Sequence, residues 1–450
     1  MSVNSAYPKD LAEFVSTRWD TEEAGSAEYF EEHSEKFKLP SLAQLEQVLS
    51  TCFQASLMLE EHRSVVFRVV LGSPSCFPPE HGPPTGLHRL EFTEPRKFSA
   101  AELRRLSPAV SFHRSLIGVD IDEDGSLSIW GFVHSGPRWL RAVHGGRGAA
   151  PPMPPTLVVN VTGPGRVEVL KGKVTIGQLV DGRIWGRSMN VFASKWLSET
   201  FLAVRKEHWD LHLQRRAQST AVWADLNPDL LRVFGQHMVK RVITAMRTSG
   251  HGGTLVVLPE ESAHGLFQKN PFVSLKYKFA EGEPRARFKS LLVNILDGLA
   301  EYGGRFLVDG SGGLRMVDWE DYEATNDQKI ADLDEAIFEV SHLIAGLTSV
   351  DGAVLMTQRF ELLGFGAEIY CENADVTHVA RALDLEGSEL RQESVEGVGT
   401  RHRSAFRLCN ELTMALAIVV SQDGSIHFVR KKGEQVVYWD HQATVSSFDF

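Results

Sequence analysis

Near its C-terminal end, the chain carries an acidic residue followed by two small ones, in the segment SVDGAVLM. Asp351 stands at the start of a predicted strand, and Gly352 and Ala353 are small enough for a ligand to approach the backbone closely. A carboxylate in this position can bind a divalent cation or orient a hydroxyl group, because hard oxygen ligands suit Mg²⁺ and Mn²⁺. An Asp-Gly pair alone is more typical of a plain turn.

A second segment, GTRHRSAFRLC, places an Arg-His-Arg cluster at 401–403, directly before a helical pattern that runs to about Asn410. Free amides and the helix dipole favour an anion at a helix N-terminus, and arginine adds donors that match phosphate oxygens. The segment therefore suits a triphosphate. An isolated Arg-x-Arg pattern is also usual in a solvated basic turn.

A third segment, AIVVSQDGSIHF, is a short apolar run that ends in Ser421 and Gln422. Polar groups at the carboxyl end of a strand often face a ligand crevice in α/β sheets. Alone, this segment says little.

The elements that position these segments are predicted to form an α/β domain over residues 222–450. Asn227 and Pro228 predict a helix start, and apolar residues from Leu231 to Met246 recur on one helical face. The run HGGTLVVLP that follows has the length and composition of a strand buried on both faces. Helix, buried strand and further alternating elements indicate an α/β fold.

The rest of the chain is divided into an N-terminal domain, residues 1–190, and a helical connector, residues 191–221. Short runs rich in β-formers, such as SVVFRVVL and TLVVNVTG, predict a β-rich α+β domain with a helix near residues 42–53. In the connector, Trp196, Phe201, Val204, Trp209 and Leu213 form a broad apolar face of one amphipathic segment. We expect this half to regulate the other through the helices between residues 191 and 247.

Composition narrows the functional classes for this chain of 450 residues. A net charge of −11 disfavours binding to the negatively charged backbone of a nucleic acid, so we expect no nucleic-acid partner. No segment approaches the roughly 20 apolar residues of a membrane helix, and the N-terminus lacks a signal-peptide pattern. These features predict a cytoplasmic protein without a membrane partner. The 4 cysteines form no CxxC pair, which fits reduced thiols.

Two other motifs are set aside. Asp120, Asp122 and Asp124 match the opening of an EF-hand loop, but Gly131 stands where the bidentate Glu is needed, so a polar hairpin turn is expected. The segment GPGRVEVLKGK lacks the GxxxxGK[ST] spacing of a phosphate-binding loop and reads as a strand.

Taken in order, the DGA, RHR and Ser-Gln segments resemble the catalytic domain of the diadenylate cyclase family, whose hallmarks are DGA and RHR motifs. HGGTLVVLP and LLGFGAEI also look like core strands of that domain. The resemblance covers roughly residues 222–440 and implies a central mixed sheet flanked by helices. It implies that two ATP molecules are joined into cyclic di-AMP in a homodimer or higher homo-oligomer.

The resemblance also implies roles for individual positions. Asp351 would bind the catalytic metal, Mg²⁺ or Mn²⁺, and help activate the attacking 3'-hydroxyl. The catalytic set would be Asp351, Arg401, His402 and Arg403. ATP would be bound by Gly352, Ala353, Thr400, Ser404, Ser421 and Gln422. Because many members have an acidic residue where Gln422 stands, no metal role is assigned to it.

Two alternatives remain open from the sequence: a catalytically silent nucleotide-binding sensor, and a nucleotidyltransferase with another nucleotide substrate. The presence of Asp351 favours an enzyme, because a binding-only relic would not need a metal ligand. Compared with the simplest family members, the chain is extended around residues 280–330 and 372–396.

Overall fold

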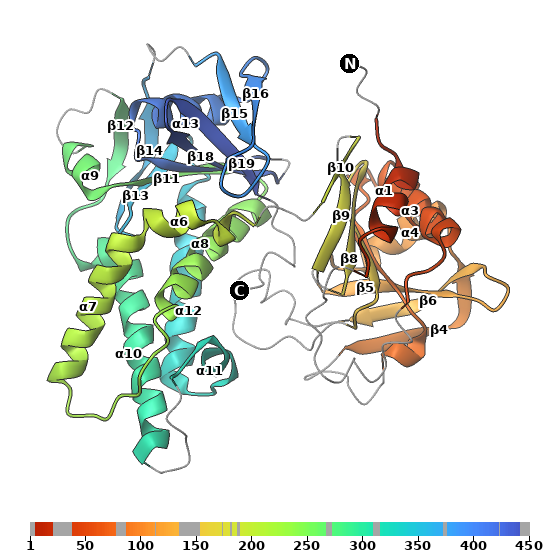
Figure 1. Ribbon diagram of the computed structural model, residues 1–450, viewed down its shortest axis with the longest axis horizontal. Coiled ribbons are helices and arrows are strands. Elements are labelled where there is room, and N and C mark those ends of the chain that lie inside the picture. Colours follow the sequence, from red (N-terminus) through yellow and green to blue (C-terminus); the bar gives the residue numbers. More distant parts are fainter. Residues whose placement is uncertain are drawn as a thin grey trace. The chain divides into compact units, whose positions relative to one another are not determined.

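The computed structural model describes residues 5–20, 38–77, 87–112, 114–134, 154–172, 174–180, 182–186, 190–266, 272–308, 316–371, 376–422 and 424–441. These residues fall into two compact units, the first reaching residue 186 and the second spanning residues 190–441 (Figure 1). Within the described ranges, no helix is long and apolar enough to cross a membrane.

The first unit is built on an eight-stranded sheet in the order β10-β9-β8-β7-β3-β5-β6-β4. Strands β3 and β5 are parallel, and the other neighbours are antiparallel. Helices α1, α3 and α4 pack on one face through residues such as Leu11, Leu49 and Leu103. The elements are α1 (Pro8–Ser16), α3 (Leu42–Ser56), β1 (Leu59–Glu60), β2 (Arg63–Ser64), β3 (Phe67–Leu71), β4 (His88–Lys97), α4 (Ala100–Leu106), β5 (Ser115–Ile121), β6 (Leu127–His134), β7 (Leu157–Gly163), β8 (Arg166–Lys171), β9 (Val174–Val180) and β10 (Arg183–Trp185).

This architecture confirms the predicted β-rich α+β fold and explains both rejected motifs. The acidic run that resembles an EF-hand is the β5–β6 turn, where the Asp122 carboxylate accepts hydrogen bonds from the hydroxyls of Ser126 and Ser128. The segment that resembles a phosphate loop forms strand β8 and pairs with β7.

The second unit is built on a nine-stranded mixed sheet in the order β12-β14-β13-β11-β17-β18-β19-β15-β16. The pairs β11–β13 and β15–β19 are parallel, and the other neighbours are antiparallel. The strands are β11 (Gly253–Leu258), β12 (Val273–Lys278), β13 (Ala353–Thr357), β14 (Leu362–Ile369), β15 (His378–Ala382), β16 (Leu390–Ser394), β17 (Leu416–Val420), β18 (Ile426–Lys432) and β19 (Gln435–His441).

Helices cover both faces of this sheet, which confirms the predicted helix-flanked mixed sheet. Strand β11 shows why its run is apolar throughout: Leu255 and Val257 join one core, whereas Val256 and Leu258 join the core on the opposite face. The helices are α6 (Lys195–Thr200), α7 (Leu202–Gln218), α8 (Leu230–Thr248), α9 (Glu260–Leu266), α10 (Arg287–Val308), α11 (Trp319–Ala324), α12 (Gln328–Leu347) and α13 (Thr400–Glu411).

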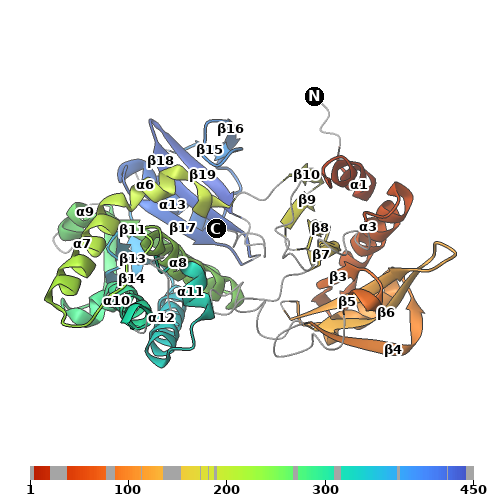
Figure 2. The ribbon, with the colours of Figure 1, turned by 60° about the horizontal axis from the view of Figure 1, so that its bottom comes forward.

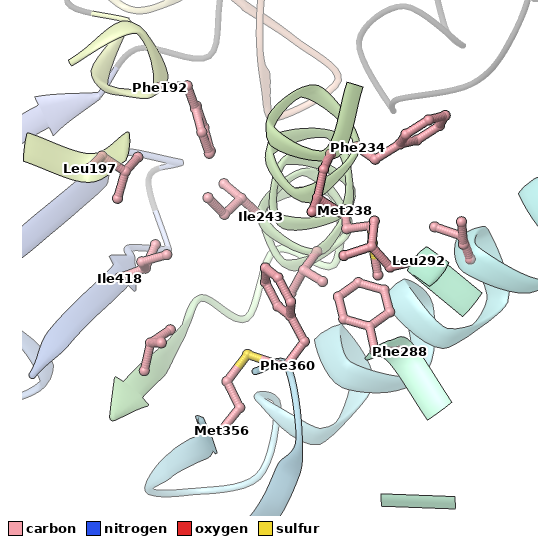
Figure 3. Packing of buried hydrophobic residues seen from close by; sticks show 14 of the residues in the cluster. Phe192, Leu197, Phe234, Met238, Ile243, Phe288, Leu292, Met356, Phe360 and Ile418 are labelled. Carbon is pink, nitrogen blue, oxygen red and sulfur yellow. The ribbon is translucent and has the colours of Figure 1, made fainter. Parts of the chain in front are cut away.

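The larger core lies between the sheet and the long helices α8, α10 and α12, which lie side by side (Figures 1 and 2). Figure 3 shows Met238 and Ile243 of α8 packed among Phe288, Phe360 and Ile418. Helix α13 packs on the opposite face through Phe406 and Leu408. The sheet is thus fixed on both sides, which holds the ends of its strands in place.

Some helix boundaries differ from those expected. Residues 191–221 belong to the second unit and form two helices that break at Phe201, whose φ of −106° and ψ of 8° leave the helical region. Leu213 is 42% exposed and does not join the apolar face. Helix α8 begins after the N-cap Asp229, because Asn227 instead accepts a hydrogen bond from the amide of Asp229.

The two extended regions have structure of their own. The first contributes α10 and α11, and α10 packs against α12 in the helical layer. The second contributes the hairpin of β15 and β16 at one edge of the sheet. Residues 309–315 and 372–375 of these regions lie outside the described residues.

Candidate active site

A pocket of about 580 Å³ lies at one end of four neighbouring strands, β14, β13, β11 and β17, beside the N-terminal turn of α13. This volume is in the range of small-molecule sites. All but one of the residues predicted for the site lie in its wall. The lining is Thr254, Asp351, Gly352, Ala353, Ala367, Glu368, Ile369, Gly399, Thr400, Arg401, His402, Ser404, Ser421 and Gln422.

The junction between α12 and β13 places Asp351 at the pocket. Helix α12 ends at Leu347, and β13 starts at Ala353, so Asp351 and Gly352 occupy the connecting turn. Gly352 has a φ of +104°, and a Cβ built there would lie 2.7 Å from the carbonyl carbon of Gly366. Only glycine fits this close approach to β14, and the exposed Asp351 carboxylate is held beside that contact.

The N-terminal turn of α13 forms the basic wall of the pocket. Its N-cap is Gly399, which has no side chain that could cap the first-turn amides of this 12-residue helix. Thr400, Arg401, His402 and Ser404 all line the pocket. Uncapped amides, hydroxyls and a guanidinium together give a surface that suits an anion such as a phosphate group.

Arg403 is the predicted residue that the pocket does not include. Its side chain is exposed on α13, because a turn of about 100° per residue places position 403 on nearly the opposite side of the helix from Arg401. The RHR cluster is thus split: two of its members face the pocket and the third faces solvent.

His402 is held from behind by a second imidazole. Its Nε2 lies 2.9 Å from Nδ1 of His427 on β18, and the two rings meet edge to face. The ring of Phe406, one helical turn further along α13, lies on another side. This contact fixes the orientation of His402 at the pocket wall.

Ser421 and Gln422 directly follow β17 and line the same pocket. The amide of Ser421 donates to the carbonyl of Ser425, and the amide of Gly424 donates back to Ser421, which closes the hairpin to β18. Asp423, in this turn, lies outside the described residues. The hairpin keeps two polar side chains at the end of the strand.

Five lining residues were missed by the sequence prediction: Thr254, Ala367, Glu368, Ile369 and Gly399. Three of them follow from strand pairing, because Ala367 on β14 lies directly opposite Ala353 on β13. The segment LLGFGAEI was recognised as a strand, but its register with the DGA strand was not available from spacing. Glu368 adds a second carboxylate, which accepts a hydrogen bond from Tyr370 and thereby raises the pKa of that phenol.

The side chains that line the pocket limit how it could bind a cation. Among the described residues, no group of three His, Cys, Asp or Glu side chains gathers as a ready-made metal site. Among the described lining residues, Asp351 and Glu368 carry carboxylates. Such a sparse set fits Mg²⁺ or Mn²⁺, which commonly take one or two carboxylates and complete their shell with water and substrate phosphates.

Comparison with protein families gave two matches. Residues 34–134 match a family described as probable sensor domain DACNV. Residues 365–434 match a family described as DisA bacterial checkpoint controller nucleotide-binding. Comparisons with curated proteins and with solved structures gave no match.

The second match includes α13, β17 and β18, and therefore the RHR cluster with Ser421 and Gln422. Asp351 precedes the matched region. The first match covers much of the helix-flanked β unit at the N-terminus. The two matches together confirm the predicted resemblance to diadenylate cyclases that carry an N-terminal sensor domain.

Proposed function

We propose that this chain is a diadenylate cyclase that joins two ATP molecules into cyclic di-AMP. The observation that carries the proposal is the meeting of the Asp351 carboxylate with the uncapped turn of α13 and Arg401 in one pocket. In each of two steps, a 3'-hydroxyl oxygen bonds to the α-phosphorus of the other ATP. The bond to pyrophosphate breaks, and the hydroxyl loses its proton. Two pyrophosphates leave in all.

The basic wall would hold the triphosphate. Backbone amides of the first turn of α13, the hydroxyls of Thr400 and Ser404, and the Arg401 guanidinium are all available to phosphate oxygens. Fixed donors of this kind stabilise the negative charge that builds on the phosphoryl oxygens and the leaving pyrophosphate. Ser421 and Gln422 would contact the phosphates from the end of β17.

The acidic wall would serve the nucleophile. We assign Asp351 to binding the cation and to orienting the attacking 3'-hydroxyl, with Gly352 and Ala353 giving the nucleotide access to the backbone. When bound, Mg²⁺ or Mn²⁺ would offset negative charge on the phosphates. Glu368, on the neighbouring strand, is a second carboxylate available to the same cation.

The product requires two ATP molecules that attack one another, so two pockets must face each other. We therefore propose that catalysis needs a homodimer or a higher homo-oligomer in which each copy holds one ATP. A monomer would bind ATP but could not close the ring. We assign Arg403, whose side chain is exposed next to the pocket, a role in the reaction between the two nucleotides and not in the binding of ATP.

The proposal is tested with Asp351→Asn and a matched control, Asp210→Asn, on an exposed side chain of α7. We expect the purified chain and the control to convert ATP to cyclic di-AMP with Mg²⁺ or Mn²⁺. Asp351→Asn should keep the fold and lose the product. Full activity of Asp351→Asn would contradict the assigned role, and competition by other nucleotides would identify a different substrate. Binding of ATP without any product, in a confirmed oligomer, would favour the silent sensor.

We also propose that the N-terminal unit regulates this site through α6, α7 and α8. The support is the seating of α6 on the catalytic sheet: the Trp196 ring lies 4.5 Å from the Trp439 ring of β19. Its indole N–H also donates to the carbonyl of Leu385. Loosening α6 with Trp196→Ala should change the rate of product formation more than the affinity for ATP. An unchanged rate would contradict this route.

A further inference from the structure

Behind the first turn of α13, strands β18 and β19 carry titratable side chains that the proposed reaction does not use. His427 on β18 lies directly opposite Asp440 on β19. Nδ1 of His427 is 2.9 Å from Nε2 of His402, and Nε2 of His427 is 4.0 Å from a carboxylate oxygen of Asp440. A chain of contacts therefore links the pocket to a carboxylate beneath it.

These contacts favour one placement of the protons on the two rings. The Asp440 carboxylate favours a proton on Nε2 of His427, the nitrogen that it faces. In a neutral His427 ring, Nδ1 then has only a lone pair and must accept. Nε2 of His402 must therefore be the donor in the bond between the two rings. The reverse assignment would set an unprotonated nitrogen of His427 against a carboxylate.

The state of His402 has a consequence for phosphate binding. When its Nε2–H is given to His427, a neutral His402 ring has only a lone pair at Nδ1. A lone pair repels a phosphate oxygen, so His402 can donate to phosphate only after a second proton arrives at Nδ1. We infer that His427 and Asp440 are positioning residues that make His402 a cationic phosphate ligand, so that ATP binding takes up a proton. This inference rests on the proposed nucleotide site.

The charged groups that the neighbouring strands present to this chain of contacts are paired. On β15, Nη2 of Arg381 lies 3.0 Å from the second carboxylate oxygen of Asp440. The Tyr438 ring on β19 lies 5.3 Å from that of His427, and its hydroxyl donates to Glu393 on β16. Burial raises the pKa of Tyr438, so this phenol stays neutral. Glu393 also pairs with Arg391. On α13 itself, Arg401 and Arg403 flank His402.

The test uses two substitutions of one residue. In His427→Asn, the amide oxygen stands roughly where Nδ1 stood and can accept the His402 proton, whereas His427→Leu offers no acceptor. The ligand is 3'-deoxyadenosine triphosphate with Mg²⁺, which lacks the attacking hydroxyl and cannot react. Calorimetric titrations near pH 8, in buffers that differ in ionisation enthalpy, give the number of protons taken up. Free histidine is mostly neutral at that pH.

We expect uptake of about one proton in the unsubstituted chain and in His427→Asn, and less than about half of that in His427→Leu. The control is His378→Leu, an exposed histidine on β15, which should match the unsubstituted chain. If His427→Leu does not fold, Asp440→Asn replaces it, because that change removes the charge that fixes His427. If His427 only packed against its neighbours, the asparagine and leucine variants would take up the same number of protons.

A second readout needs no ligand. Histidine ¹⁵N spectra of the free chain should show His402 protonated at Nε2 in the unsubstituted chain and in His427→Asn, with mixed protonation in His427→Leu. Binding without proton uptake, or a His402 ring protonated at Nδ1, would overturn the inference while leaving the cyclase proposal intact. Proton uptake on binding in a chain that forms no cyclic di-AMP would contradict only the cyclase proposal. Absence of binding would overturn both.

Discussion

Replacing His208 on α7 by leucine should make the second unit more resistant to acid. His208 is only 1% exposed, and its Nε2 has no hydrogen-bond partner among the described residues. Burial, reinforced by the positive charge of Lys289, lowers the pKa of His208 from 6.5 to about 4. The folded chain thus keeps this imidazole neutral at a pH where the unfolded chain would protonate it.

The size of the effect follows from proton linkage. Because the folded pKa lies below the unfolded one, the stability is intact above about pH 6.5 and is lost as the pH falls towards about 4. Each pH unit in this window removes about 1.4 kcal/mol from the free energy of unfolding. The full loss is about 3 kcal/mol, and about 2 kcal/mol of it is reached at about pH 5.

Hydrogen exchange measured by mass spectrometry on peptides from α7 and α10 gives the opening free energy at about pH 7.5 and about pH 5. Between these values, the unsubstituted chain should lose about 2 kcal/mol more than His208→Leu. His251→Leu, which removes an exposed histidine, should behave like the unsubstituted chain. The same pH dependence in the unsubstituted chain and in His208→Leu would refute a buried neutral imidazole.

Three further substitutions test the site and its support. Gly352→Ala forces a Cβ to within 2.7 Å of Gly366, so in thermal unfolding it should destabilise the unit by at least about 2 kcal/mol. It should also weaken ATP binding. The control is Gly346→Ala on α12, where a Cβ meets nothing within 4 Å; it should be neutral or stabilising in the same unfolding assay. Arg241→Met removes one partner of a buried ion pair with Asp334 and should lower the free energy of unfolding in urea by about 3 to 5 kcal/mol. Its control is Arg305→Met, which should lower it by less than about 1 kcal/mol, because the side chain of Arg305 is 61% exposed in its pair with Asp327. In calorimetry, Arg401→Ala should weaken binding of 3'-deoxyadenosine triphosphate at least about tenfold, and Arg403→Ala should weaken it less than about threefold. The reason is that, of these two arginines, only Arg401 lines the pocket. Equal losses of affinity would contradict the split of the RHR cluster.

Much of the fold could be predicted where its signals are local. Strand β11 was recognisable from an apolar run between a pair of glycines and a proline, and the structure buries that run on both faces. The apolar residues of α8, such as Phe234, Met238 and Val242, were recognisable from helical spacing and join one core. The acidic turn between β5 and β6 was recognisable because Gly131 breaks the EF-hand pattern.

The remaining features depend on contacts between distant segments. Glu368 reaches the pocket through the pairing of Ala353 with Ala367, and His427 reaches His402 through a strand and a helix that are far apart in sequence. The spacing of residues along the chain does not encode either contact. The exposure of Leu213 and the break at Phe201 likewise follow from tertiary packing, in which α6 lies on the sheet and α7 packs against α10; this packing outweighs the amphipathic pattern.

The central claim is tested most directly by incubating the purified full chain with ATP and either Mg²⁺ or Mn²⁺, and identifying the products by chromatography and mass spectrometry. We predict cyclic di-AMP and pyrophosphate in a ratio of one to two, formed by the oligomer and lost in Asp351→Asn. An oligomer that binds ATP and releases neither product with either metal would contradict the cyclase assignment.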